Sequence, residues 1–531
     1  MNETAQHASA TLIAALARPE AYPHPVEAVR IEETHISWVL LTGDWAYKVK
    51  KPVNLGFLDF STLGARKYFC EEELRLNRRF APEIYDSVVT IAGSQEQPRI
   101  GSGAPVLEYA VKMRQFPQDA LAGRLLERGA VTPADIDRLA DAIAGFHAAA
   151  APVPGDQPYG TPQNVLVPVM ENFHQIRAAV DASMDRAALR ALEIWSTGEF
   201  QRLRARFAQR RDEACVRECH GDLHLGNIVR IGDRLVPFDC IEFSPGLRFI
   251  DVMSEAAFLA MDLTHRQRPD LAWRMLNRYL EATGDYGGLD VLDFYRVYRA
   301  LVRAKIHAIR AAQLAACRHD TNELLAGYRG YVDLAARFTR PRRAALLITH
   351  GLSGSGKTTA TQPLLEALGA FRVRSDVERK RLHGLPALAA TQSGVGAGIY
   401  SPAATTATYE QLRNLARSIV KADFPAIVDA AFLKRAERDA FRGLAAELAV
   451  PFLVLDCRAP EAALRERVAA REREGRDASE AGLAVLEHQI AAAEPLAPDE
   501  RAHAIPAGDD PAAQARNIAR KLGLDAAAAP G

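Results

Sequence analysis

A glycine-rich segment in the second half of the chain has the residue types of a phosphate-binding loop. Residues Gly351-Leu-Ser-Gly-Ser-Gly-Lys-Thr358 match the pattern G-x-x-x-x-G-K-[ST] and follow a short apolar segment that we expect to be a strand. Glycines let the backbone approach phosphate oxygens at the positive end of the following helix. Lys357 is then placed to reach the β- and γ-phosphates of ATP, and the Thr358 hydroxyl to bind Mg²⁺. The residues predicted to bind the nucleotide are Gly351, Leu352, Ser353, Gly354, Ser355, Gly356, Lys357, Thr358 and Thr359.

Three groups of polar residues after this loop are candidates for the same chemistry. Asp376 and Arg379 follow the next predicted strand, where a carboxylate can orient or deprotonate an acceptor hydroxyl; the alternative for Asp376 is helix capping. Asp429 ends an apolar strand and is predicted to support Mg²⁺, with capping or turn formation as the alternative. Arg467 and Arg471 share one helix face and are predicted to close over the transferring phosphate, unless that helix is simply solvated and salt-bridged.

A second set of residues with phosphate-transfer chemistry lies in the first half of the chain. The segment His220-Gly-Asp222-Leu-His224-Leu-Gly-Asn227 is followed by two short strands and a turn, a hairpin that brings Asp239 back beside Asn227. Asp222 can then accept the proton of a substrate hydroxyl, while Asn227 and Asp239 hold Mg²⁺ against nucleotide phosphates.

Both halves resemble known families. The motif HGDLHLGN followed by FDCIEF resembles the aminoglycoside-phosphotransferase and choline-kinase-like family, a branch of the protein-kinase-like fold, over roughly residues 25–335. The resemblance implies Asp222 as catalytic base and Asn227 and Asp239 as metal ligands. Most of residues 342–510 resembles the small-metabolite P-loop kinases, which include gluconate kinase and the zeta-toxin type, and Asp376-x-x-Arg379 is similar to the acceptor site of polynucleotide 5′-kinases. The whole arrangement resembles the bacterial bifunctional aminoglycoside phosphotransferase/ATP-binding proteins.

The first resemblance also implies a strand lysine that contacts the α- and β-phosphates and a helix glutamate that holds it. Trp45-Ala-Tyr-Lys48 matches the V-A-I-K pattern at its alanine and lysine, so Lys48 is the preferred lysine. Lys50 is the rival because it points to the same strand face, and a solvated strand edge is the alternative for both. For the partner, Glu71, Glu72 and Glu73 are all candidates, and we select Glu73.

The elements that must position these residues indicate two domains. The 531 residues suggest two to four domains, and a basic, proline-containing stretch near residue 340 marks the clearest boundary. We predict an α+β protein-kinase-like bilobal domain at 1–338 and an α/β P-loop NTPase domain with a parallel sheet at 339–531. In the first domain, strands are expected at 33–41, 45–51 and 106–115 and helices at 66–80 and 134–150. In the second, strands are expected at 345–349, 371–374, 426–430 and 452–456.

Composition narrows the possible functions. Lys and Arg total 66 and Asp and Glu total 66, and residues 341–531 are also nearly balanced, which disfavours a protein that coats nucleic acid or an anionic membrane. The six cysteines lack paired zinc-ligand spacing, so reduced and mostly buried thiols are expected. No signal peptide or membrane-spanning run is recognised, so we expect a cytoplasmic protein.

Together these features predict an ATP- and Mg²⁺-dependent phosphotransferase with two nucleotide sites and small, hydroxyl-bearing acceptors. Two alternatives remain open. One domain is a regulatory ATP-binding module that gates the other, or the P-loop domain is a kinase of nucleic-acid 5′ ends. The balanced charge of the second half weakens the latter, because backbone binding requires clustered cations.

Overall fold

The computed structural model describes residues 3–54, 56, 58–101, 103–180, 185–389, 391, 396–474 and 478–524. The chain divides into two compact units, one made of residues 1–170 with 204–259, the other of 171–203 with 260–531. The second unit includes helices that precede residue 339, so these units are composed differently from the predicted domains 1–338 and 339–531. The domain boundary after residue 338 stays a prediction.

The first unit begins with a six-stranded sheet in which all neighbouring strands are antiparallel. In spatial order its strands are β1 (Arg30–Glu33), β2 (Ser37–Leu41), β3 (Trp45–Lys50), β6 (Val106–Arg114), β4 (Tyr85–Gly93) and β5 (Pro98–Gly101). The single strand expected at 33–41 is therefore wrong. The Thr34 hydroxyl accepts a hydrogen bond from the Ser37 N–H at 3.0 Å, and the resulting turn splits the segment into an antiparallel pair.

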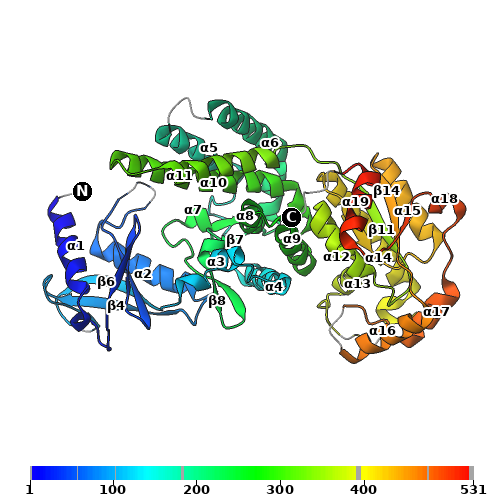
Figure 1. Ribbon diagram of the computed structural model, residues 1–531, viewed down its shortest axis with the longest axis horizontal. Helices are drawn as coiled ribbons and strands as arrows, with labels where there is room; N and C mark the ends of the chain where they lie inside the picture. The colour runs from blue at the N-terminus through cyan, green and yellow to red at the C-terminus, as the bar shows by residue number, and fades with distance from the viewer. Residues whose placement is uncertain are drawn as a thin grey trace. The chain divides into compact units, whose positions relative to one another are not determined.

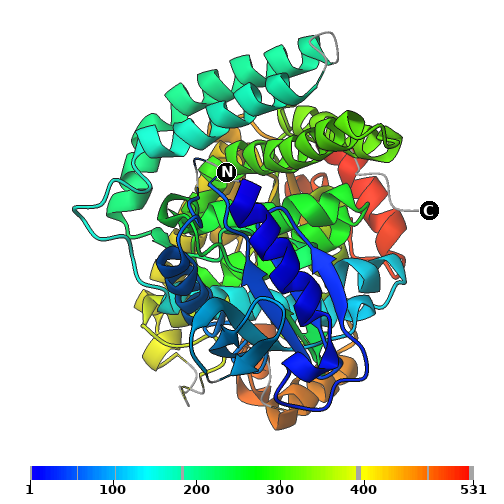
Figure 2. The same ribbon diagram turned by 90° about the vertical axis from the view of Figure 1, so that its left-hand side faces the viewer.

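Two helices cover the two faces of this sheet. Helix α1 (Glu3–Leu16) contributes Leu12, Ile13 and Leu16 to a core with Tyr47 and Val49 of β3, and Figure 2 shows it lying across the strands. Helix α2 (Leu63–Asn77) packs on the opposite face. Because strand side chains alternate, Lys48 and Lys50 point toward α2.

The rest of the first unit is mainly helical. Helix α4 begins with a capping box in which the Thr132 hydroxyl accepts from the Asp135 N–H and the Asp135 carboxylate accepts from the Thr132 N–H. The elements here are α3 (Ala122–Glu127), α4 (Pro133–Ala149), β7 (Val216–Glu218), β8 (Ile228–Ile231), β9 (Arg234–Pro237), α7 (Pro245–Arg248) and β10 (Phe249–Asp251). Three helices include residues of both units: α5 (Pro162–Ala179), α6 (Arg186–Asp212) and α8 (Val252–His265).

The second unit contains three further helices before residue 339 and then an α/β sheet. These helices are α9 (Pro269–Thr283), α10 (Leu289–Ala316) and α11 (Asn322–Phe338). The sheet has five parallel strands, in the order β12 (Phe371–Arg374), β13 (Ala426–Asp429), β11 (Leu346–His350), β14 (Phe452–Asp456) and β15 (Ala504–Pro506). The parallel sheet and four of its strands confirm the prediction, whereas the three-residue β15 was not expected.

Helices sandwich this sheet. Helices α12 (Lys357–Leu368) and α19 (Pro511–Leu522) share a buried cluster with inward residues of the sheet, and α14 (Pro402–Lys421) and α15 (Arg435–Glu447) lie against the strands as well (Figure 1). The remaining helices are α13 (Ser375–Leu382), α16 (Glu461–Glu474), α17 (Leu483–Ala492) and α18 (Pro498–Arg501). The strand register pairs His350 with Asp456 and Arg374 with Asp429, so these residues share the carboxyl edge of the sheet. The predicted fold class is confirmed for both parts of the chain.

Candidate active sites

Strand β3 and helix α2 bring the predicted lysine and glutamate together. The Lys48 Nζ donates to Glu73 Oε1 at 2.8 Å and to Asp239 Oδ1 at 2.6 Å. Glu73 is fully buried, whereas 41% of the Asp239 side chain is exposed. Burial opposes the charged form of Lys48, but these carboxylates raise its pKa well above the ordinary value, so it stays protonated.

Lys50 shares the same glutamate. Its Nζ donates to Glu73 Oε2 at 2.8 Å and also to Glu242, and both partners are buried. The two other glutamates considered as partners point elsewhere: Glu71 pairs with Lys67 and Glu72 with Arg75. Both lysines therefore form an ion pair with Glu73, because each oxygen of the carboxylate accepts from one of them.

The loop between β7 and β8 places Asp222 and Asn227 in contact. The Asn227 Nδ2 donates to Asp222 Oδ2 at 2.9 Å and to the Asp222 carbonyl at 3.1 Å. The predicted hairpin is present as β8 and β9, and the Phe238 N–H donates to the Asn227 carbonyl at 2.9 Å. Asp239 follows directly, with a left-handed φ of 64°, and its N–H donates to the Tyr85 hydroxyl at 3.1 Å. Among non-glycine residues, aspartate is one of the few that adopt this conformation readily.

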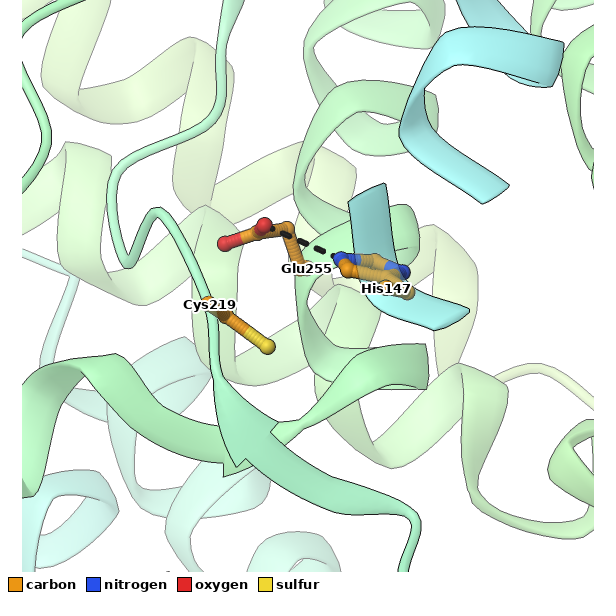
Figure 3. A group of neighbouring side chains, drawn as sticks. All are labelled: His147, Cys219 and Glu255. Carbon is orange, nitrogen blue, oxygen red and sulfur yellow. Dashed lines mark hydrogen bonds and ion pairs between the residues drawn. The ribbon is translucent and has the colours of Figure 1, made fainter. Parts of the chain in front are cut away.

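A buried glutamate that the sequence analysis did not single out braces this loop. Glu255 of α8 accepts from the backbone N–H groups of His220 and Gly221 at 3.0 and 2.7 Å, and from His147 Nε2 of α4 at 3.1 Å (Figure 3). Although burial opposes ionisation, the hydrogen bond from His147 lowers the pKa of Glu255 to about 2. Burial lowers the pKa of His220, and its neutral ring accepts from the Asp222 N–H while Nε2 donates to the Phe238 carbonyl.

Cys219 lies beside this brace. Its sulfur and ligand atoms of His147 and Glu255 lie within 4.8 Å of one another, and all three residues are buried (Figure 3). Sequence spacing does not reveal the cluster, because its members come from a helix, a strand end and a second helix. Three N–H donors already engage the Glu255 carboxylate, which makes it a structural anchor of the loop.

The phosphate-binding loop joins β11 to α12 in a conformation that needs glycine. Gly351 has a φ of 147°, and a Cβ there would lie 2.3 Å from the Cys457 carbonyl oxygen. Gly354 has a φ of 82°, and a Cβ would lie 3.0 Å from the carbonyl oxygen of Leu464 in α16. The loop is therefore packed closely between β14 and α16, and side chains at these positions would displace it.

Lys357 and Thr358 begin helix α12 at the same place. The Lys357 Nζ donates to the carbonyls of Gly351 and Leu352 at 2.9 and 2.8 Å, and the Thr358 hydroxyl donates to Asp429 Oδ2 at 2.7 Å. Burial lowers the pKa of Lys357, opposed by the charges of Asp429 and Asp376. The structure thus brings both predicted magnesium-binding oxygens, from Thr358 and Asp429, into direct contact.

Asp376 and Arg379 lie on helix α13 after β12. Arg374 occupies the N-cap position, so Asp376 lies in the first turn and is not the cap. Arg379 is buried, donates to the Ile399 carbonyl at 2.9 Å, and its guanidinium lies 5.0 Å from the centre of the Tyr400 ring.

Helix α16 carries the two predicted arginines, of which Arg467 contacts the loop. Arg467 donates to the Gly354 carbonyl at 3.2 Å, and Arg471 donates to the Ala481 carbonyl at 2.9 Å. Leu464, Val468 and Leu486 form a buried cluster against which Leu352 of the loop packs. The structure brings Arg467 to the loop and leaves Arg471 bound to the segment before α17.

Two residues at the carboxyl edge of the sheet were missed by the sequence analysis. His350 Nδ1 and Asp456 Oδ1 are 2.8 Å apart, and His350 immediately precedes the first glycine of the loop. Burial opposes ionisation of Asp456, whereas the hydrogen bond with His350 favours it, and the pKa of the carboxyl group is lowered. The rule that ligands gather where parallel strands end could have found Asp456, the last residue of β14.

The sheet orders and the two loops define kinase-like folds, a protein-kinase-like part followed by a P-loop α/β part. Residues 346–496 match a family model described as an AAA domain. An uncharacterized protein of Mycobacterium tuberculosis (strain ATCC 25618 / H37Rv) is 28% identical over 459 residues, which covers 86% of this chain and 89% of that protein. An uncharacterized protein of Mycobacterium bovis is similar to the same extent.

Solved structures are similar to each part separately. A choline/ethanolamine kinase family protein from Mesorhizobium loti is 12% identical with a TM-score of 0.38, covering 62% of this chain and 94% of its own. A gluconokinase from Sinorhizobium meliloti 1021 is 20% identical with a TM-score of 0.25, covering 35% of this chain and 94% of its own. Among the helices of the described residues, none combines the length and apolar character needed to cross a bilayer.

Proposed function

We propose that the chain is an ATP- and Mg²⁺-dependent phosphotransferase with two nucleotide sites, which transfers the γ-phosphate to hydroxyl groups of small molecules. The observation that carries this proposal is the convergence of a lysine with site carboxylates in two separate places. Lys48 contacts Glu73 and Asp239, and Lys357 lies beside the Thr358–Asp429 contact. Phosphoryl transfer depends on such positioning and charge neutralisation rather than on covalent chemistry of the protein.

At the first site, the donor set suits a magnesium nucleotide. Asn227 and Asp239 supply oxygen ligands, which Mg²⁺ prefers, and the partly exposed Asp239 carboxylate would hold it together with Asn227. Bound Mg²⁺ supplies charge neutralisation on the phosphates. Lys48 contacts the α- and β-phosphates, and Asp222 accepts the proton of the acceptor hydroxyl. Glu255 keeps the loop that carries Asp222 in place.

At the second site, the loop itself fits a phosphate. Gly356 has open space where a side chain would stand, since no atom lies within 4 Å of a Cβ built there, and the Ser355 Oγ is a buried polar atom without a hydrogen-bond partner in the described part of the chain. The oxygens of Thr358 and Asp429 would hold Mg²⁺. Lys357 leaves the loop carbonyls to bind phosphate, Asp376 and Arg379 position the acceptor hydroxyl, and Arg467 and Arg471 stabilise the transferring phosphate.

Small acceptors are favoured over nucleic acid. Backbone recognition requires clustered cations, whereas the second half of the chain has nearly equal numbers of basic and acidic residues. A screen of small metabolites for ATP-dependent mass increases of one phosphate group would identify the acceptors. A short 5′-hydroxyl oligonucleotide in the same screen tests the nucleic-acid alternative directly.

Single-turnover assays with γ-labelled ATP test the two sites. We expect Asp222→Ala to lower the rate of phosphate transfer at the first site, and Lys357→Ala the rate at the second, each by at least a hundredfold. Each substitution removes a group that acts on the reacting phosphate or hydroxyl. The exposed residues Asp233 and Lys421 provide matched controls as alanine variants. Unchanged ATP consumption in both site variants contradicts the proposal. ATP binding without turnover at one site, measured by calorimetry with each variant, instead supports a regulatory nucleotide module.

A further inference from the structure

Five charged side chains form one continuous chain of ion pairs in the first unit. In order they are Asp239, Lys48, Glu73, Lys50 and Glu242. The Glu73 side chain is fully buried and each of its oxygens accepts from one lysine at 2.8 Å. Lys50 is also fully buried, and the Glu242 side chain is 3% exposed. Of the two ends of this series of ion pairs, only Asp239 is therefore exposed to solvent.

Lys50 supplies a second counter-charge to the buried Glu73 carboxylate. A buried carboxylate that loses its counter-charge is strongly destabilising. If Lys48 alone balanced Glu73, a shift of its ammonium toward a nucleotide phosphate would weaken that balance. Since Lys50 holds the second oxygen of Glu73, the carboxylate keeps one buried cation whatever Lys48 does.

Lys50 is itself fixed in position. Its ammonium lies 5.0 Å from the centre of the Phe60 ring and donates to Glu242 on the side away from Glu73. Burial opposes its charge, but Glu242 and Glu73 raise the pKa of Lys50 above the ordinary value. Glu242 therefore anchors the cation that balances Glu73, and neither residue reaches the open end at Asp239.

We propose that Lys50 and Glu242 are positioning residues of the first site, which keep Glu73 in place and charge-balanced while Lys48 moves from Asp239 to a nucleotide phosphate. The inference rests on the proposed nucleotide-binding function of that site. Both carboxylates of the FDCIEF motif then have a function at this site: Asp239 as the predicted metal ligand and Glu242 as the residue that holds Lys50.

Equilibrium binding of a fluorescent ADP analogue with Mg²⁺ tests this in the full chain. The Lys357→Ala background confines binding to the first site, and circular dichroism confirms that each variant is folded. We expect Lys50→Met to weaken binding at least tenfold and Lys50→Arg to restore most of it. Lys51→Met is the matched control and should change binding less than twofold, because Lys51 is the next residue along and pairs with Glu33, which is 64% exposed.

A double-mutant cycle separates a positioning role from a merely structural one. If Lys50 acts through Glu73 and Lys48, then Lys50→Met in a Lys48→Met background changes affinity less than twofold. An equal loss with and without Lys48 overturns the inference. Should Lys50→Met fail to fold, Glu242→Gln takes its place, since glutamine keeps the size of the side chain and still accepts a hydrogen bond from Lys50. We expect Glu242→Gln to lower the affinity threefold or more when Lys48 is present, and not in the Lys48→Met background.

The outcomes distinguish this inference from the function on which it rests. No binding of the analogue to the Lys357→Ala protein contradicts the first nucleotide site itself. Binding that depends on Lys48 but not on Lys50 or Glu242 leaves that site standing and overturns only the positioning role.

Discussion

Among the buried residues of the first unit, Glu255 shows how a single carboxylate organises a loop. Three N–H donors, from His147, His220 and Gly221, converge on its two oxygens. The folded chain stabilises its charged form, which is why its pKa falls from an ordinary 4.5 to about 2 against the effect of burial. Ionisation of Glu255 therefore contributes to the stability of the loop that carries Asp222.

The stabilising effect of ionised Glu255 depends on pH. A carboxyl group whose pKa is lower in the folded state stabilises the fold fully above pH 4.5, and the contribution is lost as the pH falls toward 2. At neutral pH it amounts to roughly 3 kcal/mol. We expect Glu255→Gln to lower the urea midpoint at pH 7 and the gap from the native protein to narrow between pH 4.5 and 3. A gap that is constant over this range contradicts the assignment.

Residue types predicted much of both sites, but not the residues that support them. Asp222, Asn227, Lys357 and Thr358 stand in short motifs whose spacing reflects the chemistry directly. His147 and Glu255 cannot be found this way, because their contact depends on how two distant helices pack. For Lys48 and Lys50, the period of a strand left two equivalent candidates, and only the position of Glu73 between them shows that both lysines pair with this glutamate.

At the scale of elements, helices α16 and α17 form one wall of the phosphate-binding loop. Leu352 of the loop packs against a cluster built from Leu464, Val468 and Leu486. The Ser353 N–H donates to the Gln489 side chain of α17 at 2.8 Å. Loop geometry thus depends on apolar packing of two helices that carry few of the predicted site residues.

Truncation of Leu486 tests this dependence. Leu486 is fully buried, so Leu486→Ala leaves a cavity beneath the loop and should lower stability by about 2–5 kcal/mol. We also expect weaker nucleotide binding at the second site, measured by calorimetry in a Lys48→Met background that removes the phosphate-contacting lysine of the first site. Leu483→Ala on the same helix is the control, because Leu483 is 41% exposed. Equal effects of the two substitutions contradict the role of the cluster.

Element prediction succeeded where periodicity is strong and failed where elements are short. Apolar runs ending in polar residues predicted β12, β13 and β14 almost to the residue, and these runs placed Asp429 at the sheet edge. Strand β15 has three residues, too few for a pattern to show. The turn at Thr34 was missed because the residues on both sides favour strands, and a single hydroxyl decides where the chain reverses.

At the scale of the whole molecule, helix α9 is tied to the edge of the parallel sheet. The Trp273 ring packs edge-on against Phe371 and Phe424, with ring centres 5.8 and 6.2 Å apart. Asn277 donates to the Ala370 carbonyl and accepts from the Arg372 N–H, at 2.9 and 2.8 Å. Helix α9 thereby adds a layer to the P-loop sheet from outside the segment that matches the AAA domain model.

Removal of the Trp273 ring should therefore destabilise the second unit. We expect Trp273→Ala to cost about 3–5 kcal/mol, because the ring fills space between α9 and β12. In a Lys48→Met background, which weakens binding at the first site, differential scanning calorimetry should show the transition protected by ADP and Mg²⁺ shifting to lower temperature. Tyr68→Ala, which removes an aromatic ring that is 56% exposed, should leave both transitions unchanged. An unshifted transition for Trp273→Ala contradicts the contribution of α9.

The tie between α9 and β12 also has a consequence for synthesis on the ribosome. Asn277 and Arg372, which hydrogen-bond to each other, are 95 residues apart in sequence. At about 5–20 residues per second, α9 waits roughly 5–20 s after it is made before its partner strand exists. During that interval the apolar face of Trp273 has no strand to cover it. The growing chain therefore passes through a stage at which chaperones and proteases can act on α9, and how fast ribosomes read the codons between the two elements sets the duration of that stage.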